Sequence, residues 1–304
     1  VPRPAMLVAM VTLALWPLLL VLARPGARLD RTASQVLAGF AVLAVAAVTI
    51  GMSYHETSAI ALVLSAAAAA LAFWSPRLAT TMVAVAWVVS TLLVVPIASQ
   101  AYTQKMHMAE WLPDTARHRI IIWGYTAEQI PNAPILGIGI GSGKILDARH
   151  KYETPPGHLY PRRAGTHSHN IYVQAWYELG AIGAVLLCAL GLALLAAIGR
   201  LERQLQSSAL ATFVAGAAIA AFSWGMWQPW FMAAFGIAAV WFLIAAERAR
   251  LFRTLATLRV DARIGTDVDG LWWVGPRPGF AAWAGRLGAP ALHERATSLA
   301  AARS

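Results

Sequence analysis

The chain has 304 residues, of which 59% are hydrophobic and only 12% are charged, and its mean hydropathy is +0.58. Soluble domains average about 25% charged residues, so this composition excludes an ordinary soluble domain and favours a membrane protein. The net charge is +10, but the basic residues flank apolar stretches, which favours membrane lipid over nucleic acid as a partner. The single cysteine, Cys188, excludes a disulfide framework.

Hydropathy predicts an all-α integral membrane protein with about seven transmembrane helices, since a bilayer core requires about 20 apolar residues per helix. The uncharged stretch 204–246 is too long for one helix, and residues 223–229 break it into a hairpin. The chain begins with Val1 rather than methionine and has an odd number of spans, so we expect upstream helices to be missing. The predicted spans are 5–23, 35–52, 58–75, 80–98, 171–198, 206–222 and 229–246.

Basic residues in the short connections predict the orientation of these spans. Alternate connections, 53–57 and 223–228, contain no Lys or Arg. The positive-inside rule therefore places the Arg-bearing connections in the cytoplasm and the long connection 99–170 in the periplasm. The arginines of the cytoplasmic connections are Arg24, Arg28, Arg31, Arg77, Arg200 and Arg203.

The pattern predicts four parts. Residues 1–98 form transmembrane helices 1–4, residues 99–170 form a large, partly helical periplasmic loop, and residues 171–246 form helices 5–7. Residues 247–304 form a basic cytoplasmic tail, for which we expect a juxtamembrane helix followed by a poorly ordered stretch.

The long loop holds the residues that can do chemistry, including six of the eight histidines. Residues 117–130 read as a helix, with Asp114 as N-cap and Pro131 as the stop, and Arg119 and Trp123 would share one face of it. A glycine-rich turn follows at 134–143.

Two other types of site are conceivable in this loop, a phosphate site and a metal site. Glycine-rich turns can bind phosphate through backbone N–H groups, but no Gly-Lys-Ser/Thr ending is present, and close packing is the favoured role of these glycines. A zinc or manganese site could use His158, His167, His169 and Glu153. Because the loop lacks His-x3-His spacing and paired carboxylates, we expect no metal ion and no cofactor.

Three elements in the same order resemble the O-antigen ligase / O-antigen polymerase superfamily of bacterial inner-membrane proteins, over roughly residues 35–246. The helix that begins at His55-Glu56-Thr57-Ser58 departs from the family, because many members carry Ser-Arg there. Members usually have about a dozen spans, so this chain looks like the C-terminal seven. The matching elements are Arg119-Ile-Ile-Ile-Trp123, Pro134-Ile-Leu-Gly137-Ile-Gly139, and His167-Ser-His169-Asn170 followed nine residues later by Gly180-Ala-Ile-Gly183.

The resemblance implies transfer of a glycan from undecaprenyl diphosphate to an acceptor sugar hydroxyl. It implies His169 as the catalytic residue, and a neutral imidazole can accept the hydroxyl proton. It implies Arg119 as a diphosphate contact, since arginine binds phosphate bidentately. Arg117 and His167 are further candidates for substrate binding.

Several polar residues near the predicted site could stabilise the fold instead of binding substrate. Asn170 is a candidate for substrate binding, but we expect it chiefly to cap the following helix. Arg117, Arg162 and Arg163 could equally pair with lipid headgroups or with Asp or Glu in the loop. We expect Glu178, two turns into the helix, to be a buried partner of an arginine.

The acceptor stays open at this point. A ligase would transfer the glycan to lipid A core, a polymerase would transfer it to a growing polysaccharide on the same carrier, and a protein O-glycosylating enzyme would use a protein hydroxyl. A transporter is a remote alternative, because it would require charged residues in the middle of the spans, and the predicted spans have essentially none.

The orientation can be tested by cysteine labelling in a Cys188→Ala background. We expect an impermeant thiol reagent to label Lys151→Cys and to miss Glu202→Cys until the membrane is permeabilised. Labelling at 202 with protection at 151 would show that the topology is inverted.

Overall fold

The computed structural model describes residues 3–22, 32–53, 55–149, 154–156, 160–223, 225–256, 273 and 275–302. Within these ranges the chain is helical and has no strand, which confirms the predicted all-α class for the described part. The chain divides into two compact units, Val1–Leu251 and Phe252–Ser304.

Four helices of the first unit are long and apolar enough to cross a membrane: α3 (Glu56–Trp74), α4 (Pro76–Thr103), α7 (Ile171–Ile198) and α8 (Arg203–Phe222). They correspond to four of the seven predicted spans. Their outward faces are apolar, as on α4, where Leu78, Met82, Val85 and Val89 are exposed. Such faces suit lipid rather than water.

The other three predicted spans fall on α1 (Arg3–Leu22), α2 (Thr32–Met52) and α9 (Pro229–Ala256). Their apolar stretches in the described residues are shorter, Ala5–Leu20, Leu37–Met52 and Pro229–Ile244. Seven spans therefore remain a prediction. The connection that carries Arg24, Arg28 and Arg31 lies outside the described residues.

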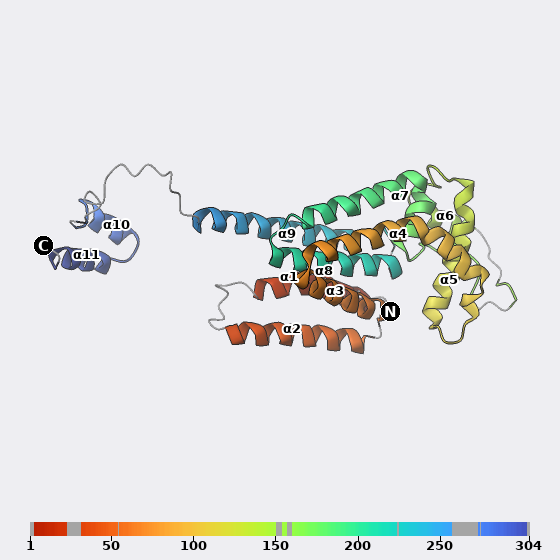
Figure 1. Cartoon of the computed structure of the whole chain (residues 1–304), viewed down its shortest axis with the longest axis horizontal. Helices are drawn as coiled ribbons and strands as arrows, with labels where there is room; N and C mark the ends of the chain where they lie inside the picture. Colours follow the sequence, from red (N-terminus) through yellow and green to blue (C-terminus); the bar gives the residue numbers. More distant parts are fainter. Residues whose placement is uncertain are drawn as a thin grey trace. The chain divides into compact units, whose positions relative to one another are not determined.

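Small residues allow α3 and α8 to pack closely (Figure 1). On α3, Ala61, Ser65, Ala68 and Ala72 are buried at spacings of three and four, so they form one face of the helix. Ala61 packs in one cluster with alanines of α8, including Ala215. Small side chains bring helix backbones close together and increase the van der Waals contact that drives association in membranes.

Tryptophans join α4 to α7. The Trp87 indole donates a hydrogen bond to the Cys188 carbonyl at 3.2 Å. A Cβ at Gly191 would lie 2.1 Å from Trp87 Nε1, so only glycine allows this approach. One helical turn along α4, the Thr91 carbonyl accepts a hydrogen bond from the Trp176 indole at 2.8 Å.

The four helices alternate in direction, so α3 and α7 begin at the end where α4 and α8 finish. At the opposite end, Arg203 donates hydrogen bonds to the last carbonyls of α3, Phe73 and Trp74. The connections α3–α4 and α7–α8 therefore lie at one end of the four helices, and the long connection α4–α7 lies at the other end. The predicted topology requires this alternation. Which side of the membrane each end faces stays a prediction.

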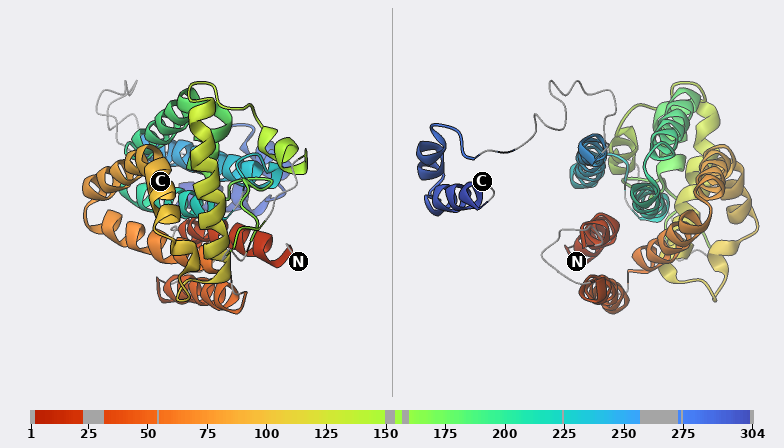
Figure 2. Two further views of the ribbon diagram at one scale, coloured as in Figure 1. Left: turned by 90° about the vertical axis from the view of Figure 1, so that its right-hand side faces the viewer. Right: turned by 60° about the vertical axis from the view of Figure 1, so that its left-hand side comes forward.

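The loop after α4 starts at residue 104 and folds at the first of these ends. It contains α5 (Asp114–Gln129), α6 (Ser142–Arg149) and two 3-10 turns, η1 (Met106–Met108) and η2 (Ile130–Asn132). Figure 2 (left) shows the yellow and lime segments of the loop lying across the end of the helices. The predicted start of α5 was wrong: Pro113 is the N-cap, and Asp114 lies in the first turn.

Helix α7 is broken at Gly180, where φ is +65° and ψ is −159°. The glycine turn completes the hydrogen bonds that the helix loses there. Ile138 and Gly139 donate to the carbonyls of Tyr177 and Glu178, at 3.1 and 2.9 Å. In the reverse direction, the N–H groups of residues 181 and 182 donate to the carbonyls of residues 134 and 135, at 2.8 and 3.3 Å.

Glycines are required on both sides of this contact. A Cβ at Gly137, where φ is +67°, would lie 2.3 Å from the Glu178 carbonyl carbon. A Cβ at Gly180 would lie 2.4 Å from the Ile135 carbonyl. The structure therefore supports the close-packing role of the glycine turn.

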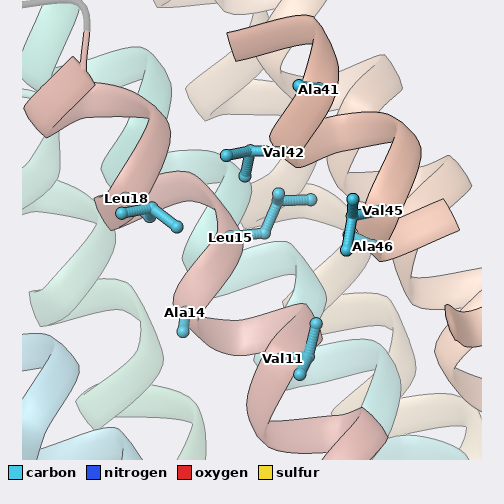
Figure 3. A pocket seen from close by; sticks show the side chains of 8 residues that line it. All are labelled: Val11, Ala14, Leu15, Leu18, Ala41, Val42, Val45 and Ala46. Carbon is cyan, nitrogen blue, oxygen red and sulfur yellow. The ribbon is translucent and has the colours of Figure 1, made fainter. Parts of the chain in front are cut away.

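An apolar groove of about 360 Å³ lies between α1 and α2 (Figure 3). Valine, leucine and alanine side chains line it. Because no polar side chain lines it, this groove has no group that could bind phosphate or sugar.

The second unit contains α10 (Phe280–Arg286) and α11 (Ala291–Ala301). The expectation of a poorly ordered stretch after the juxtamembrane helix is therefore wrong for these residues. The basic residues Arg259 and Arg263 lie outside the described residues.

The contact at the break of α7 can be tested by Gly180→Ala. An alanine there must adopt a left-handed conformation against the Ile135 carbonyl, so we expect it to lower the free energy of unfolding by about 2–4 kcal/mol. Thermal unfolding in detergent measures the loss. Gly236→Ala is the matched control, because no atom lies within 4 Å of its added Cβ, and it should be neutral or stabilising. An unchanged melting temperature for Gly180→Ala would contradict the role assigned to the break.

Candidate functional site

The candidate site is built where four segments meet at one end of the helices. The segment 167–170 leads into α7, and α5 packs against it through Trp123, whose indole donates to the Ser168 carbonyl at 2.7 Å. The start of α3 and the end of α8 meet at the same place, through His55 and Ser223.

Asn170 caps α7. Its Oδ1 accepts hydrogen bonds from the N–H groups of Tyr172 and Val173, at 2.9 and 3.0 Å. The bonds satisfy two of the free N–H groups of the first helical turn, which confirms the predicted cap. The role of Asn170 toward substrate stays a prediction.

His169 lies directly before this cap in a left-handed conformation, with φ +52°. Such a conformation costs a non-glycine residue about 1–2 kcal/mol, so surrounding contacts must hold it. Nδ1 of His169 lies 2.7 Å from the carbonyl oxygen of Ser223. Because a carbonyl can only accept, Nδ1 carries the proton and Nε2 of the neutral ring is left with a free lone pair.

Burial and the neighbouring His167 lower the pKa of His169 to about 4. Burial is also the main cause that lowers the pKa values of the histidines around it, His55, His118 and His167. His169 is therefore neutral at pH 7 and can accept a proton there.

His167 lies beside His169, with ring centroids 4.1 Å apart and ring planes at 86°. The turn after α8 packs against it, since a Cβ at Gly225 would lie 2.8 Å from His167 Cδ2. The structure thus brings together the two histidines of the motif. The use of His167 in substrate binding stays a prediction.

Arg119 is half-buried on α5, one turn before Trp123. Its positive charge lowers the pKa values of both His169 and His55, so the guanidinium is within electrostatic range of both rings. Burial lowers the pKa of Arg119, and the nearby Glu56 carboxylate opposes this shift. No ion pair of Arg119 is formed within the described ranges, which leaves its guanidinium available to an anion.

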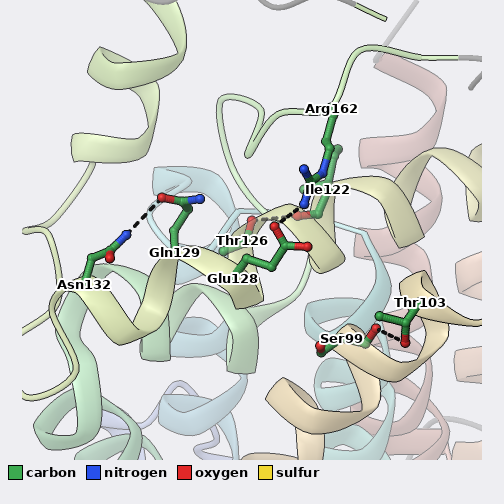
Figure 4. Close-up of polar contacts among 8 residues, drawn as sticks. All are labelled: Ser99, Thr103, Ile122, Thr126, Glu128, Gln129, Asn132 and Arg162. Carbon is green, nitrogen blue, oxygen red and sulfur yellow. Dashed lines mark hydrogen bonds and ion pairs between the residues drawn. The ribbon is translucent and has the colours of Figure 1, made fainter. Parts of the chain in front are cut away.

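Arg117 and Arg162 are engaged by carboxylates of the loop. Arg117 pairs with Asp114 on its own helix. Arg162 pairs with Glu128 of α5 (Figure 4) and lies 5.2 Å from the ring centroid of Tyr102. Both arginines therefore pair with carboxylates of the loop, as one of the two interpretations of the sequence expected. A contact of Arg117 with substrate stays a prediction, and this ion pair does not support it.

Glu178 is 2% exposed and has no arginine partner among the described residues. The expectation of a buried ion pair was wrong. The carboxylate accepts hydrogen bonds from the Gly141 N–H at 2.9 Å, from the Gln174 amide at 3.0 Å and from the Trp227 indole. Glu178 therefore joins the glycine turn, α7 and the turn after α8.

The described residues support neither a metal site at the histidines of the loop nor phosphate binding by the glycine turn. They contain no group of three His, Cys, Asp or Glu side chains that could hold a metal ion. His158 and Glu153 lie outside them. The N–H groups of Gly137, Ile138, Gly139 and Gly141 already donate to protein acceptors, so they do not form a free phosphate cradle.

Neither Ser223 nor His55 is among the site residues that the sequence predicts, and His55 stands out there only as part of a departure from the family pattern. The two residues are 168 positions apart, and His55 Nε2 lies 3.3 Å from Ser223 Oγ. No spacing rule could have paired them, although both flank predicted spans at the same end.

Comparisons with known proteins agree with the resemblance. The O-antigen ligase family model matches residues 39–188, a shorter range than the 35–246 expected. A protein of Rickettsia conorii provisionally named a polysaccharide ligase is 29% identical over 169 residues, 54% of this chain and 39% of that protein. A protein of Rickettsia bellii with the same provisional name is 30% identical over 135 residues, 43% of this chain and 31% of that protein.

This chain spans only about two fifths of the length of the first of these relatives. No solved structure matches it significantly. The matched range includes α5, the glycine turn, His169 and the break of α7. Over residues 39–188, the chain therefore matches the O-antigen ligase family model.

Proposed function

We propose that the protein transfers a glycan from undecaprenyl diphosphate to a sugar hydroxyl of lipid A core, without a metal ion. The family and the names of the relatives support a glycan ligase role. The observation that carries the proposal is the arrangement of His169 and Arg119. A neutral imidazole with a free Nε2 lies within electrostatic range of a guanidinium that has no ion-pair partner within the described ranges.

His169 acts as the general base in this proposal. The acceptor hydroxyl attacks C1 of the first sugar, Nε2 takes the hydroxyl proton, and the bond from C1 to the phosphate oxygen breaks. A sugar hydroxyl is a poor nucleophile, so removal of its proton during attack lowers the barrier. The sugar–phosphate bond is already activated, so the transfer requires no nucleotide.

Arg119 acts on the leaving group. Undecaprenyl diphosphate gains negative charge as the bond breaks, and a planar guanidinium stabilises it through two parallel hydrogen bonds. The same anion would raise the pKa of the nearby His169, because a negative charge favours the protonated ring. The histidine would thus become a stronger base only when the donor is bound.

We further propose that the protein lies in the bacterial inner membrane, with the long loop in the periplasm and the C-terminus in the cytoplasm. The site lies at the end that carries this loop, opposite the end with Arg77, Arg200 and Arg203. The arginines at that opposite end suit a cytoplasmic face under the positive-inside rule.

The proposed function predicts the effect of His169→Ala. We expect transfer from lipid-linked glycan to fall by about 10²–10⁴-fold, the usual cost of losing a general base, at unchanged amounts of protein in the membrane. His158→Ala should have a mild effect. The assay uses the full-length protein and compares lipid A core with a lipid-linked repeat unit as acceptor. Near-normal transfer by His169→Ala would remove this residue from the mechanism, and exclusive use of the repeat unit would identify a polymerase.

The role of Arg119 predicts a graded response to substitution. Arg119→Lys keeps the charge but loses the bidentate geometry, so we expect partial activity, whereas Arg119→Ala should be nearly inactive. If the side chain only reaches lipid headgroups, lysine would serve as well as arginine. Close to full transfer by the alanine variant at matched expression would rule out the diphosphate contact.

A further inference from the structure

The orientation of His169 depends on a main-chain group of another helix. Its Nδ1 is hydrogen-bonded to the carbonyl oxygen of Ser223, the residue that ends α8. The direction of that carbonyl is set by the backbone of Ser223, so whatever fixes Ser223 also fixes the ring of His169.

Ser223 is held on two sides. Its N–H donates to the Ile219 carbonyl at 2.9 Å, which continues the hydrogen bonding of α8 by one residue. Its hydroxyl, buried with the rest of the residue, lies 3.3 Å from His55 Nε2. Beyond this cap the backbone leaves the helix, with φ −131° and ψ −55° at Ser223.

His55 is itself fixed at the start of α3. Its Nδ1 lies 2.7 Å from Ser58 Oγ in the first turn of the helix. A continuous series of hydrogen bonds thus runs from Ser58 through His55 and Ser223 to His169. It links α3, the end of α8 and the start of α7.

We propose that His55 is a positioning residue, which acts through Ser223 to hold the ring of His169 with Nε2 free toward the substrate. The structural part of this proposal stands on the hydrogen bonds above, and its consequence for catalysis rests on the proposed glycan transfer. His55 contacts no substrate in this account.

The charges around the two rings make the proposal testable. Arg119 and Glu56 face His55, and His167, Arg119 and His118 face His169. Burial lowers the pKa of His55 below its ordinary value, so this ring is neutral at pH 7. Replacing it with a neutral side chain therefore changes the hydrogen bonding without changing the charge near His169.

The test measures His169 directly. Diethyl pyrocarbonate acylates only unprotonated imidazole nitrogen, so its rate of reaction at His169 as a function of pH reports the pKa of that ring. The full-length protein in membranes is labelled from pH 3.5 upward, and tandem mass spectrometry separates His169 from His167. The variants are His55→Ala, His55→Gln, Ser223→Ala and the double alanine variant. Ser207→Ala is the matched control, since its hydroxyl bonds to a group of α3, the Ala69 carbonyl, near the start of α8, toward the opposite end.

In wild type we expect the midpoint of labelling at about 4. His55→Ala and Ser223→Ala should each move it toward the ordinary value of about 6.5, because a released ring meets water, and burial affects this pKa more than the Ser223 hydrogen bond, whose loss acts in the opposite direction. The double variant should match the single ones, the amide of His55→Gln should restore much of the wild-type profile, and Ser207→Ala should leave it unchanged. Transfer should fall roughly tenfold to a hundredfold in the alanine variants, as for a misplaced catalytic group, with the KM for donor unchanged.

A wild-type labelling profile in both His55 variants would overturn the proposal, even if transfer were reduced. Additive shifts in the double variant would also overturn it, because they would mean that His55 acts independently of Ser223. If labelling shifts as expected but wild type transfers no glycan, the positioning of His169 stands and the proposed function fails.

Discussion

The break of α7 at Gly180 is the constraint on which the rest of the site depends. Backbone groups in a membrane must find hydrogen-bond partners inside the protein, and an interrupted helix leaves some without one. The glycine turn supplies these partners through four backbone hydrogen bonds. The long loop is thereby joined directly to a helix that is long and apolar enough to cross a membrane, and the first turns of α7 are fixed relative to the loop.

The fixed part of α7 carries the groups that organise the site. Asn170 starts the helix, and Gln174 and Glu178 hold the turn after α8 by accepting from the Met226 N–H and the Trp227 indole. That turn begins at Ser223, whose carbonyl orients His169. The result is a neutral, buried imidazole within electrostatic range of Arg119, an arrangement that combines positive charge with proton-accepting capacity.

Hydropathy, helix-capping preferences and helical periodicity predicted the features that are set by residues close together in the sequence. These features are the helical class, four of the spans, the cap at Asn170 and the shared face of Arg119 and Trp123. The same rules failed where distant segments meet. Glu178 was assigned an arginine partner, because a buried carboxylate usually requires a cation, yet N–H donors from three segments satisfy it. The pairing of His55 with Ser223 and the break at Gly180 depend on tertiary contacts, and neither has a signature in local spacing.

The most direct test of this account is a cryo-EM structure of the full-length protein with undecaprenyl diphosphate bound. The account predicts the diphosphate in contact with the Arg119 guanidinium, His169 Nδ1 still bonded to the Ser223 carbonyl, and Nε2 facing the position of the sugar C1. A diphosphate bound elsewhere, with Arg119 in contact only with lipid headgroups or Glu56, would contradict it.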